Sequence, residues 1–182
     1  MLALFLKGGV LMYPILLCSL VGVAILIDKS IQYRKILREL EIPPDDILKN
    51  SIKPNLLAPI LEGLKHNCDE KEMSIIGAKQ IQRIEKGLSW LGLIATIAPL
   101  LGLTGTVTGM IRAFTVISQS PSVNPSMLAG GIWEALITTA AGLLVAIPIH
   151  IGHHYLEKQA DEIAFGMKEM ITVLQARVRH GI

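Results

Sequence analysis

GLSWLGLIATIAPLLGLTGTVTGMI, residues 87–111, decides the fold, because it runs for twenty-five residues without a charged side chain. A helix of about 20 apolar residues is long enough to cross the ~30 Å hydrocarbon core of a bilayer. The composition of the chain agrees: 51% of the residues are hydrophobic and 18% are charged, against roughly 25% charged in an average soluble protein. The stretch therefore predicts a membrane-spanning helix in an all-α membrane protein.

Two further apolar segments complete three predicted transmembrane helices. Residues 8–27 hold no charge, and residues 127–149 are interrupted only by Glu134. The first segment could instead be a cleaved signal peptide. Its apolar run is longer than the ~7–15 residues of such a peptide and continues directly into a polar helical pattern, which favours an uncleaved span.

The remaining segments are polar and, in large part, helical in pattern. The polar turn 118–126 joins the spans 87–117 and 127–149, which are therefore expected to form a hairpin. Helical extensions of the hairpin are expected in 28–86 and 150–182. Four prolines between positions 43 and 59 predict a broken linker inside the first of these extensions.

Basic residues set the predicted orientation. The segment 28–86 contains eleven Lys and Arg and the tail 150–182 contains four, which leaves two on the opposite side. The positive-inside rule then places both segments in the cytoplasm, and the N-terminus (1–7) and the turn 118–126 outside. An inverted topology is the alternative.

Glu134 is the residue that most suggests a function. It is the one charged residue between Arg112 and Glu157. A charged side chain at the centre of a bilayer costs ~2.5–3.5 kcal/mol on insertion scales, and such residues usually face a bundle interior or a water-filled path. We therefore expect a carboxyl group that holds and releases an ion. The alternative is a structural glutamate hydrogen-bonded to a neighbouring helix.

Threonines are expected close to Glu134. A lone threonine in a membrane helix bonds to its own backbone, whereas several at one depth could line an ion path. In an antiparallel hairpin around the turn, residues whose numbers sum to about 245 share a depth. This count pairs Thr106 with Thr139, and Thr138 shares the face of Glu134 because it follows four residues later.

Small residues and prolines are expected to shape the packing of the hairpin. Glycines let membrane helices approach closely, and prolines kink or locally open a helix. The residues concerned are Gly102, Gly105, Gly109, Gly142, Pro99 and Pro148.

Other classes of function have little support. The sequence has no hydrolase, metalloprotease or nucleotide-binding motif, so no enzyme and no catalytic residue is expected. His150 and His154 have metal-ligand spacing, but no acidic or cysteine partner lies nearby, so no metal site is expected. No basic stripe with aromatic residues predicts nucleic-acid binding.

Two motifs resemble a known family. TIAPLLGLTGTVTGMIRAF (96–114) and LAGGIWEALITTAAGLLVAIP (128–148) are similar to the second and third spans of the ExbB/TolQ/MotA family of proton-channel motor subunits. Three predicted spans favour the ExbB/TolQ branch, because the MotA-type flagellar stators have four. The rest of the chain matches the family in layout alone.

The resemblance implies a machine in the bacterial inner membrane. Family members form a homopentamer around two copies of a single-span ExbD/TolR-type partner, which carries an aspartate in its span. The assembly converts the proton motive force into mechanical work on the cell envelope, in transport or envelope maintenance, and a TonB/TolA-like energy-transducing protein could receive that work. By motif position, the family's membrane glutamate falls on Glu134 and its two lumen-facing threonines fall on Thr106 and Thr139.

Some positions depart from the family pattern. Thr108 stands where the family usually has tryptophan, Gly130 where it has proline, and Trp133 where it has alanine. Trp133 shares a depth with Arg112 in the hairpin, and we therefore expect an outer interface in which the indole stacks on the guanidinium.

The coupling ion and the mechanism stay open at this point. The proton is the expected ion and no other cofactor is expected, but extra hydroxyls at Thr104, Thr108 and Thr138 could favour Na⁺, because hard cations prefer oxygen ligands. A non-conducting membrane scaffold that anchors a partner is a rival interpretation. A secondary transporter is a weaker rival, because the chain has no internal repeat.

Overall fold

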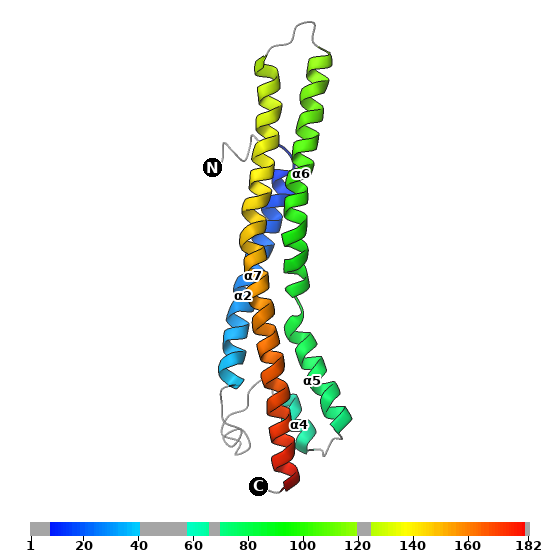
Figure 1. The fold of residues 1–182 in the computed structure, drawn as a ribbon, viewed down its shortest axis with the longest axis vertical. Coiled ribbons are helices and arrows are strands. Elements are labelled where there is room, and N and C mark those ends of the chain that lie inside the picture. The colour runs from blue at the N-terminus through cyan, green and yellow to red at the C-terminus, as the bar shows by residue number, and fades with distance from the viewer. Residues whose placement is uncertain (1–7, 41–57, 66–69, 120–124, 181–182) are drawn as a thin grey trace. The chain divides into compact units, whose positions relative to one another are not determined.

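The computed structural model describes residues 8–40, 58–65, 70–119 and 125–180. Its elements are the α-helices α2 (Met12–Leu40), α4 (Ala58–Lys65), α5 (Glu70–Glu85), α6 (Leu88–Ser118) and α7 (Pro125–His180), shown in Figure 1. Three helical stretches are long and apolar enough to cross a membrane: Met12–Leu40, Lys71–Ser118 and Ala129–Ala176. The prediction of an all-α protein with three transmembrane helices is therefore confirmed.

Helix boundaries differ from the predicted boundaries of the spans. The apolar run begins at position 8, but α2 begins at Met12, because residues 8–11 form a turn in which Gly9 has φ +70°. Past the apolar runs, α2 continues to Leu40 and α7 continues to His180. Polar residues end the hydrophobic segments but sustain the helices. The expected proline-marked linker falls largely in 41–57, outside the described residues.

The chain divides into two compact units. The first comprises Met1–Leu26 and Ser89–His153, and the second comprises Ile27–Leu88 and His154–Ile182. In the first unit, α2 packs on both helices of the hairpin: Gly22 faces the side chains of Ile149 on α7 and Ile94 on α6. The expected hairpin is present, since α6 and the first part of α7 run antiparallel beside each other in Figure 1.

A stripe of small residues brings α6 and α7 together. Most buried positions of α6 recur every three or four residues, so they lie on one face of the helix; they include Leu91, Ala95, Ala98, Gly102, Gly105, Gly109 and Ala113. The facing positions of α7 include Ala135, Thr138 and Gly142. A Cβ atom added at Gly142 would lie 2.6 Å from the carbonyl oxygen of Ala98. The two backbones are therefore in contact, which is possible only with glycine at such positions.

The two prolines lie inside these helices. Both α6 and α7 are continuous through Pro99 and Pro148. Each proline removes one backbone donor from the helical ladder, but the neighbouring turns on both sides remain helical.

In the second unit, two side chains of α2 secure the end of α5. Lys29 Nζ and Tyr33 Oη both donate to the carbonyl oxygen of Ile84, at 3.0 Å each. This satisfies one of the carbonyls that a helix leaves free at its C-terminus. The chain then passes through Gly87, which has φ +109°, and α6 begins at Leu88.

Burial changes the acid–base properties of this pair, which follows the apolar run ending at Ile27. Desolvation raises the pKa of Tyr33 to about 12, with a further contribution from Glu85. Desolvation also lowers the pKa of Lys29, and the neighbouring Asp28 partly offsets this effect. The tyrosine hydroxyl therefore keeps the proton that it donates to Ile84 throughout the physiological range.

Gly105 tests the close approach of α6 and α7. A Cβ atom at this position would overlap the side chain of Thr138. We expect Gly105→Ala to lower the free energy of unfolding by about 1–3 kcal/mol, the usual cost of overpacking. Thermal unfolding of the protein in detergent measures the change.

Gly130→Ala is the matched control, because a Cβ atom there would meet nothing within 4 Å. In a helix, alanine is more favourable than glycine by up to ~1 kcal/mol, so this variant should be as stable as the parent or more stable. Equal loss of stability in both variants would show that the helices are not packed as described.

Candidate functional site: a carboxylate between the hairpin and the start of α2

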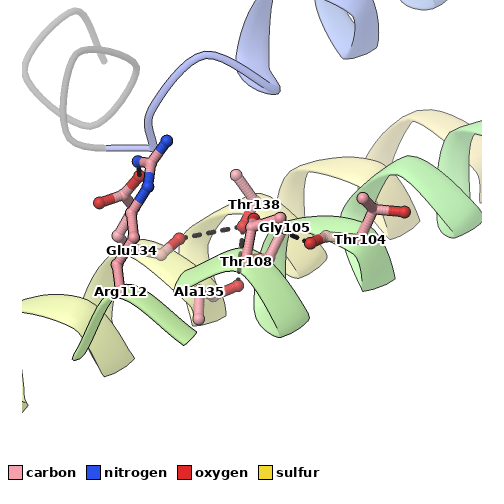
Figure 2. Close-up of polar contacts among 7 residues, drawn as sticks. All are labelled: Thr104, Gly105, Thr108, Arg112, Glu134, Ala135 and Thr138. Atoms are coloured by element: carbon pink, nitrogen blue, oxygen red, sulfur yellow. Dashed lines mark hydrogen bonds and ion pairs between the residues drawn. The ribbon is translucent and has the colours of Figure 1, made fainter. Parts of the chain in front are cut away.

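Glu134 lies on α7 and forms an ion pair with α6. Its Oε1 accepts a hydrogen bond from Nη1 of Arg112 at 3.1 Å (Figure 2). The glutamate side chain is 30% exposed and the arginine side chain is 62% exposed. The carboxylate is thus partly enclosed, whereas the guanidinium reaches it from a more open position.

The turn before α2 covers the carboxylate from another side. A Cβ atom added at Gly9 would overlap Oε1 of Glu134. Gly9 also has φ +70°, a backbone conformation that side-chain-bearing residues rarely adopt. Glycine is therefore required at this position twice, once for the turn and once for the close approach to Glu134. Figure 2 shows this segment passing beside the Arg112–Glu134 pair.

A small cavity extends from Glu134 along the hairpin. Its volume is about 130 Å³, and its lining residues are Gly8, Val10, Leu11, Thr104, Gly105, Thr108, Arg112, Glu134 and Thr138. This is room for several water molecules, since one water occupies ~30 Å³ of the liquid. The cavity is therefore lined by Glu134 and by three threonines of the same unit.

The three hydroxyls use their hydrogens on the helix backbone. Thr104 donates to the carbonyl of Leu100 at 2.8 Å, and Thr108 donates to the carbonyl of Thr104 at 2.9 Å. Thr138, which is 1% exposed, donates to the carbonyl of Ala135 at 2.8 Å. A hydroxyl has one hydrogen and two lone pairs, so these groups keep acceptor capacity. The cavity thus combines one carboxylate with hydroxyl oxygens that can accept.

Thr106 and Thr139, predicted to share a depth, make different contacts. Thr139 donates to the carbonyl of Gly102 on the opposite helix at 2.8 Å. Thr106 donates to the carbonyl of Leu103 on its own helix at 2.6 Å and lines a groove along α6 with Val107 and Met110. Neither residue lines the cavity beside Glu134. The hydroxyls of the pair are therefore not bonded to each other, although Gly102 lies only one turn from Thr106.

The expected stacking of Trp133 on Arg112 is wrong. The Arg112 guanidinium binds Glu134, and the indole of Trp133 is 52% exposed. Among the described residues, the cation–π contact is between Lys29 and Tyr33, at 5.8 Å from ammonium nitrogen to ring centroid. The ion pair prevails because a guanidinium hydrogen-bonds to a carboxylate more strongly than it attracts an exposed ring.

Sequence reasoning missed two parts of this site. The Arg112–Glu134 pair could be predicted from the sequence. The depth count, with a sum of about 245, places Glu134 level with residue 111, which is next to Arg112. The covering turn could not be predicted, because no periodic pattern links Gly9 to a residue 125 positions later. The Gly8–Gly9 pair before an apolar run signals a turn, but it does not say what the turn contacts.

Comparison with known proteins agrees with the motifs. Residues 40–169 match the model of the MotA/TolQ/ExbB proton channel family. The chain is 36% identical over 167 residues to the putative biopolymer transport protein ExbB-like 1 of Synechocystis sp., covering 79% of this chain and 65% of that protein.

Two relatives from other bacteria match the conserved part of the chain. The identity is 45% over 84 residues with the biopolymer transport protein exbB1 of Vibrio cholerae, covering 46% of this chain and 37% of that protein. It is 34% over 93 residues with the Tol-Pal system protein TolQ of Haemophilus influenzae, covering 51% and 41%. The chain thus spans less than two thirds of each of these relatives. The family model and the names of the relatives show that the chain belongs to the ExbB/TolQ branch of the MotA/TolQ/ExbB proton channel family.

Proposed function

We propose that this protein is the channel subunit of an ion-driven motor in the bacterial inner membrane. It converts the proton motive force into mechanical work on the cell envelope, in transport or envelope maintenance. The observation that carries the proposal is the position of Glu134, a carboxylate in the third apolar helix that lines a cavity together with three threonines. An ionisable group at such a place in a membrane helix marks an ion path.

The proposed mechanism combines the polar groups of the hairpin with the partner that the family resemblance implies. A proton enters from the outer side, is held in turn by Glu134, and loads an aspartate on the partner subunit. It leaves toward the cytoplasm past Thr106 and Thr139. One elementary charge that crosses 100 mV releases ~2.3 kcal/mol, so several steps supply enough free energy for a conformational change between the subunits.

The surface of α6 supports an assembly. Beside the face that packs on α7, α6 exposes large apolar side chains, including Leu103, Val107, Ile111 and Phe114. Such a surface suits lipid or other transmembrane helices. Following the family resemblance, we include in the proposal a homopentamer around two single-span ExbD/TolR-type partners, with a TonB/TolA-like protein as the recipient of the work. The N-terminus is periplasmic and the C-terminus is cytoplasmic in this arrangement.

A sodium-driven motor is the second candidate. It is favoured by one observation, namely that Thr104, Thr108 and Thr138 line the same cavity as Glu134. Hard cations prefer oxygen ligands. A purely structural scaffold is distinguished by substitution, since it requires neither the carboxylate nor the hydroxyls.

Substitution of Glu134 tests the proposed function. Glutamine keeps the size and much of the polarity of the side chain but cannot exchange a proton or carry a charge. We expect Glu134→Gln to abolish proton flux through the assembly, purified with its co-purifying subunits and reconstituted in vesicles, while the size of the assembly stays unchanged. Full flux in this variant would leave the scaffold as the better interpretation.

Substitution of Thr139 tests the hydroxyl between the helices. Thr139→Val removes the hydrogen bond to Gly102; bonds of this kind contribute only ~0.6 kcal/mol on average in membrane proteins. We expect a large loss of proton flux beside this small loss of stability, because the hydroxyl belongs to the path. Thr139→Ser should retain the flux.

Thr96→Val is the control, because the Thr96 hydroxyl bonds only to the carbonyl of Gly92 on its own helix and is exposed. Unchanged flux in Thr139→Val, or an equal loss in Thr96→Val, would remove Thr139 from the path.

A further inference from the structure

The ion pair at Glu134 is a feature that an ion path does not by itself require. A path needs a carboxylate that a passing ion can reach, but here a guanidinium already lies at that carboxylate, with 3.1 Å between Nη1 and Oε1. Arginine keeps its positive charge at every physiological pH. Glu134 is therefore occupied by a permanent cation that is attached to the same chain.

Two features of the pair make it exchangeable. The structure gives a single nitrogen–oxygen contact between the side chains, and bidentate pairs of arginine with carboxylate are stronger. The guanidinium side chain is also 62% exposed, so few side chains of this chain hold it in place. Arg112 can therefore leave the carboxylate without being pulled out of a packed interior.

The surroundings of the pair suit a second cation. The residues that line the cavity beside Glu134 include Thr104, Thr108 and Thr138. Their hydrogens point to backbone carbonyls, so their oxygens are the groups left to bind an ion. Without Arg112, one carboxylate and hydroxyl oxygens around a space of about 130 Å³ would form a site for a small hard cation such as Na⁺.

From these contacts we infer that Arg112 is a specificity-determining residue, a tethered cation that keeps Na⁺ away from Glu134 and leaves the carboxylate to protons. The inference rests on the proposed role of Glu134 in the ion path. Sodium binds only through the charge of the carboxylate and through oxygen ligands, and the guanidinium competes for that same charge. The guanidinium opposes protonation too, but a proton forms a covalent O–H bond with the carboxylate and cancels its charge, which Na⁺ cannot do.

Uptake and release of a proton at Glu134 return the ion pair to its starting state. One proton binds to the carboxylate, and the guanidinium, which keeps all its own protons, is released from the pair. When that proton moves on, the carboxylate regains its charge and Arg112 returns. Among the described residues, the side chain that brings a charge to Glu134 is Arg112, since Gly9 contributes backbone and the cavity-lining threonines are neutral.

Sodium NMR tests the inference without any measurement of transport. The linewidth of the sodium signal broadens when Na⁺ exchanges with a binding site, so it detects weak binding. The samples are the protein purified with its co-purifying subunits, unsubstituted and as Arg112→Gln and Arg112→Ala, each with and without Glu134→Gln. Arg112→Lys is the matched control, because it keeps the positive charge.

We expect no Glu134-dependent broadening in the unsubstituted protein or in Arg112→Lys. In Arg112→Gln and Arg112→Ala, broadening should appear and should vanish when Glu134→Gln is added. The Glu134-dependent broadening in these two variants should exceed that in the unsubstituted protein by at least about fivefold.

Three results would overturn the inference: Glu134-dependent broadening in the unsubstituted protein, its absence in both neutral variants, or its appearance in Arg112→Lys. The first result suffices alone, even where a variant does not fold. Failure of the proposed function has a different signature, namely proton flux that persists in Glu134→Gln, and the binding result does not depend on it.

Discussion

The backbone contact between α6 and α7 is the constraint on which the rest of the structure depends. Glycines and alanines recur every three or four residues on the facing surfaces, and a methyl group at Gly105 would already overlap Thr138. Membrane helices gain little from the hydrophobic effect against lipid, so close packing and interhelical hydrogen bonds must hold them together. The bond from Thr139 to the carbonyl of Gly102 is possible only because the backbones approach so closely.

This contact also decides where charge lies. It brings Arg112 of α6 beside Glu134 of α7, and it buries Thr138 one turn away. The turn before α2 completes the enclosure, because Gly9 allows the backbone to pass directly over the carboxylate. A carboxylate that would be costly alone in the bilayer is thereby given a counter-ion and a small polar cavity. The same interface between α6 and α7 therefore determines both the packing of the helices and the position of the Arg112–Glu134 pair.

Much of this could be predicted from the sequence. Uncharged runs predict the spans, and the polar turn between 87–117 and 127–149 predicts the hairpin. The depth count is within about one helical turn of the observed register, since Gly105 meets Thr138, Arg112 meets Glu134 and Thr139 meets Gly102. It could not predict that Arg112 binds Glu134 rather than Trp133, because neighbouring residues on a helix differ by ~100° in direction and a shift of one residue selects another partner. The contact of Gly9 depends on tertiary packing and has no periodic signal.

The central claim is that Glu134, held at this interface, takes up and releases the transported ion. Infrared difference spectroscopy of the purified assembly tests it most directly, because a carboxylate that gains a proton acquires the carbonyl band of a carboxylic acid. The account predicts a band that changes when a proton gradient is imposed on the reconstituted assembly and that is absent from the Glu134→Gln variant. An identical set of bands in the two proteins would show that Glu134 does not bind the proton, and would contradict the account.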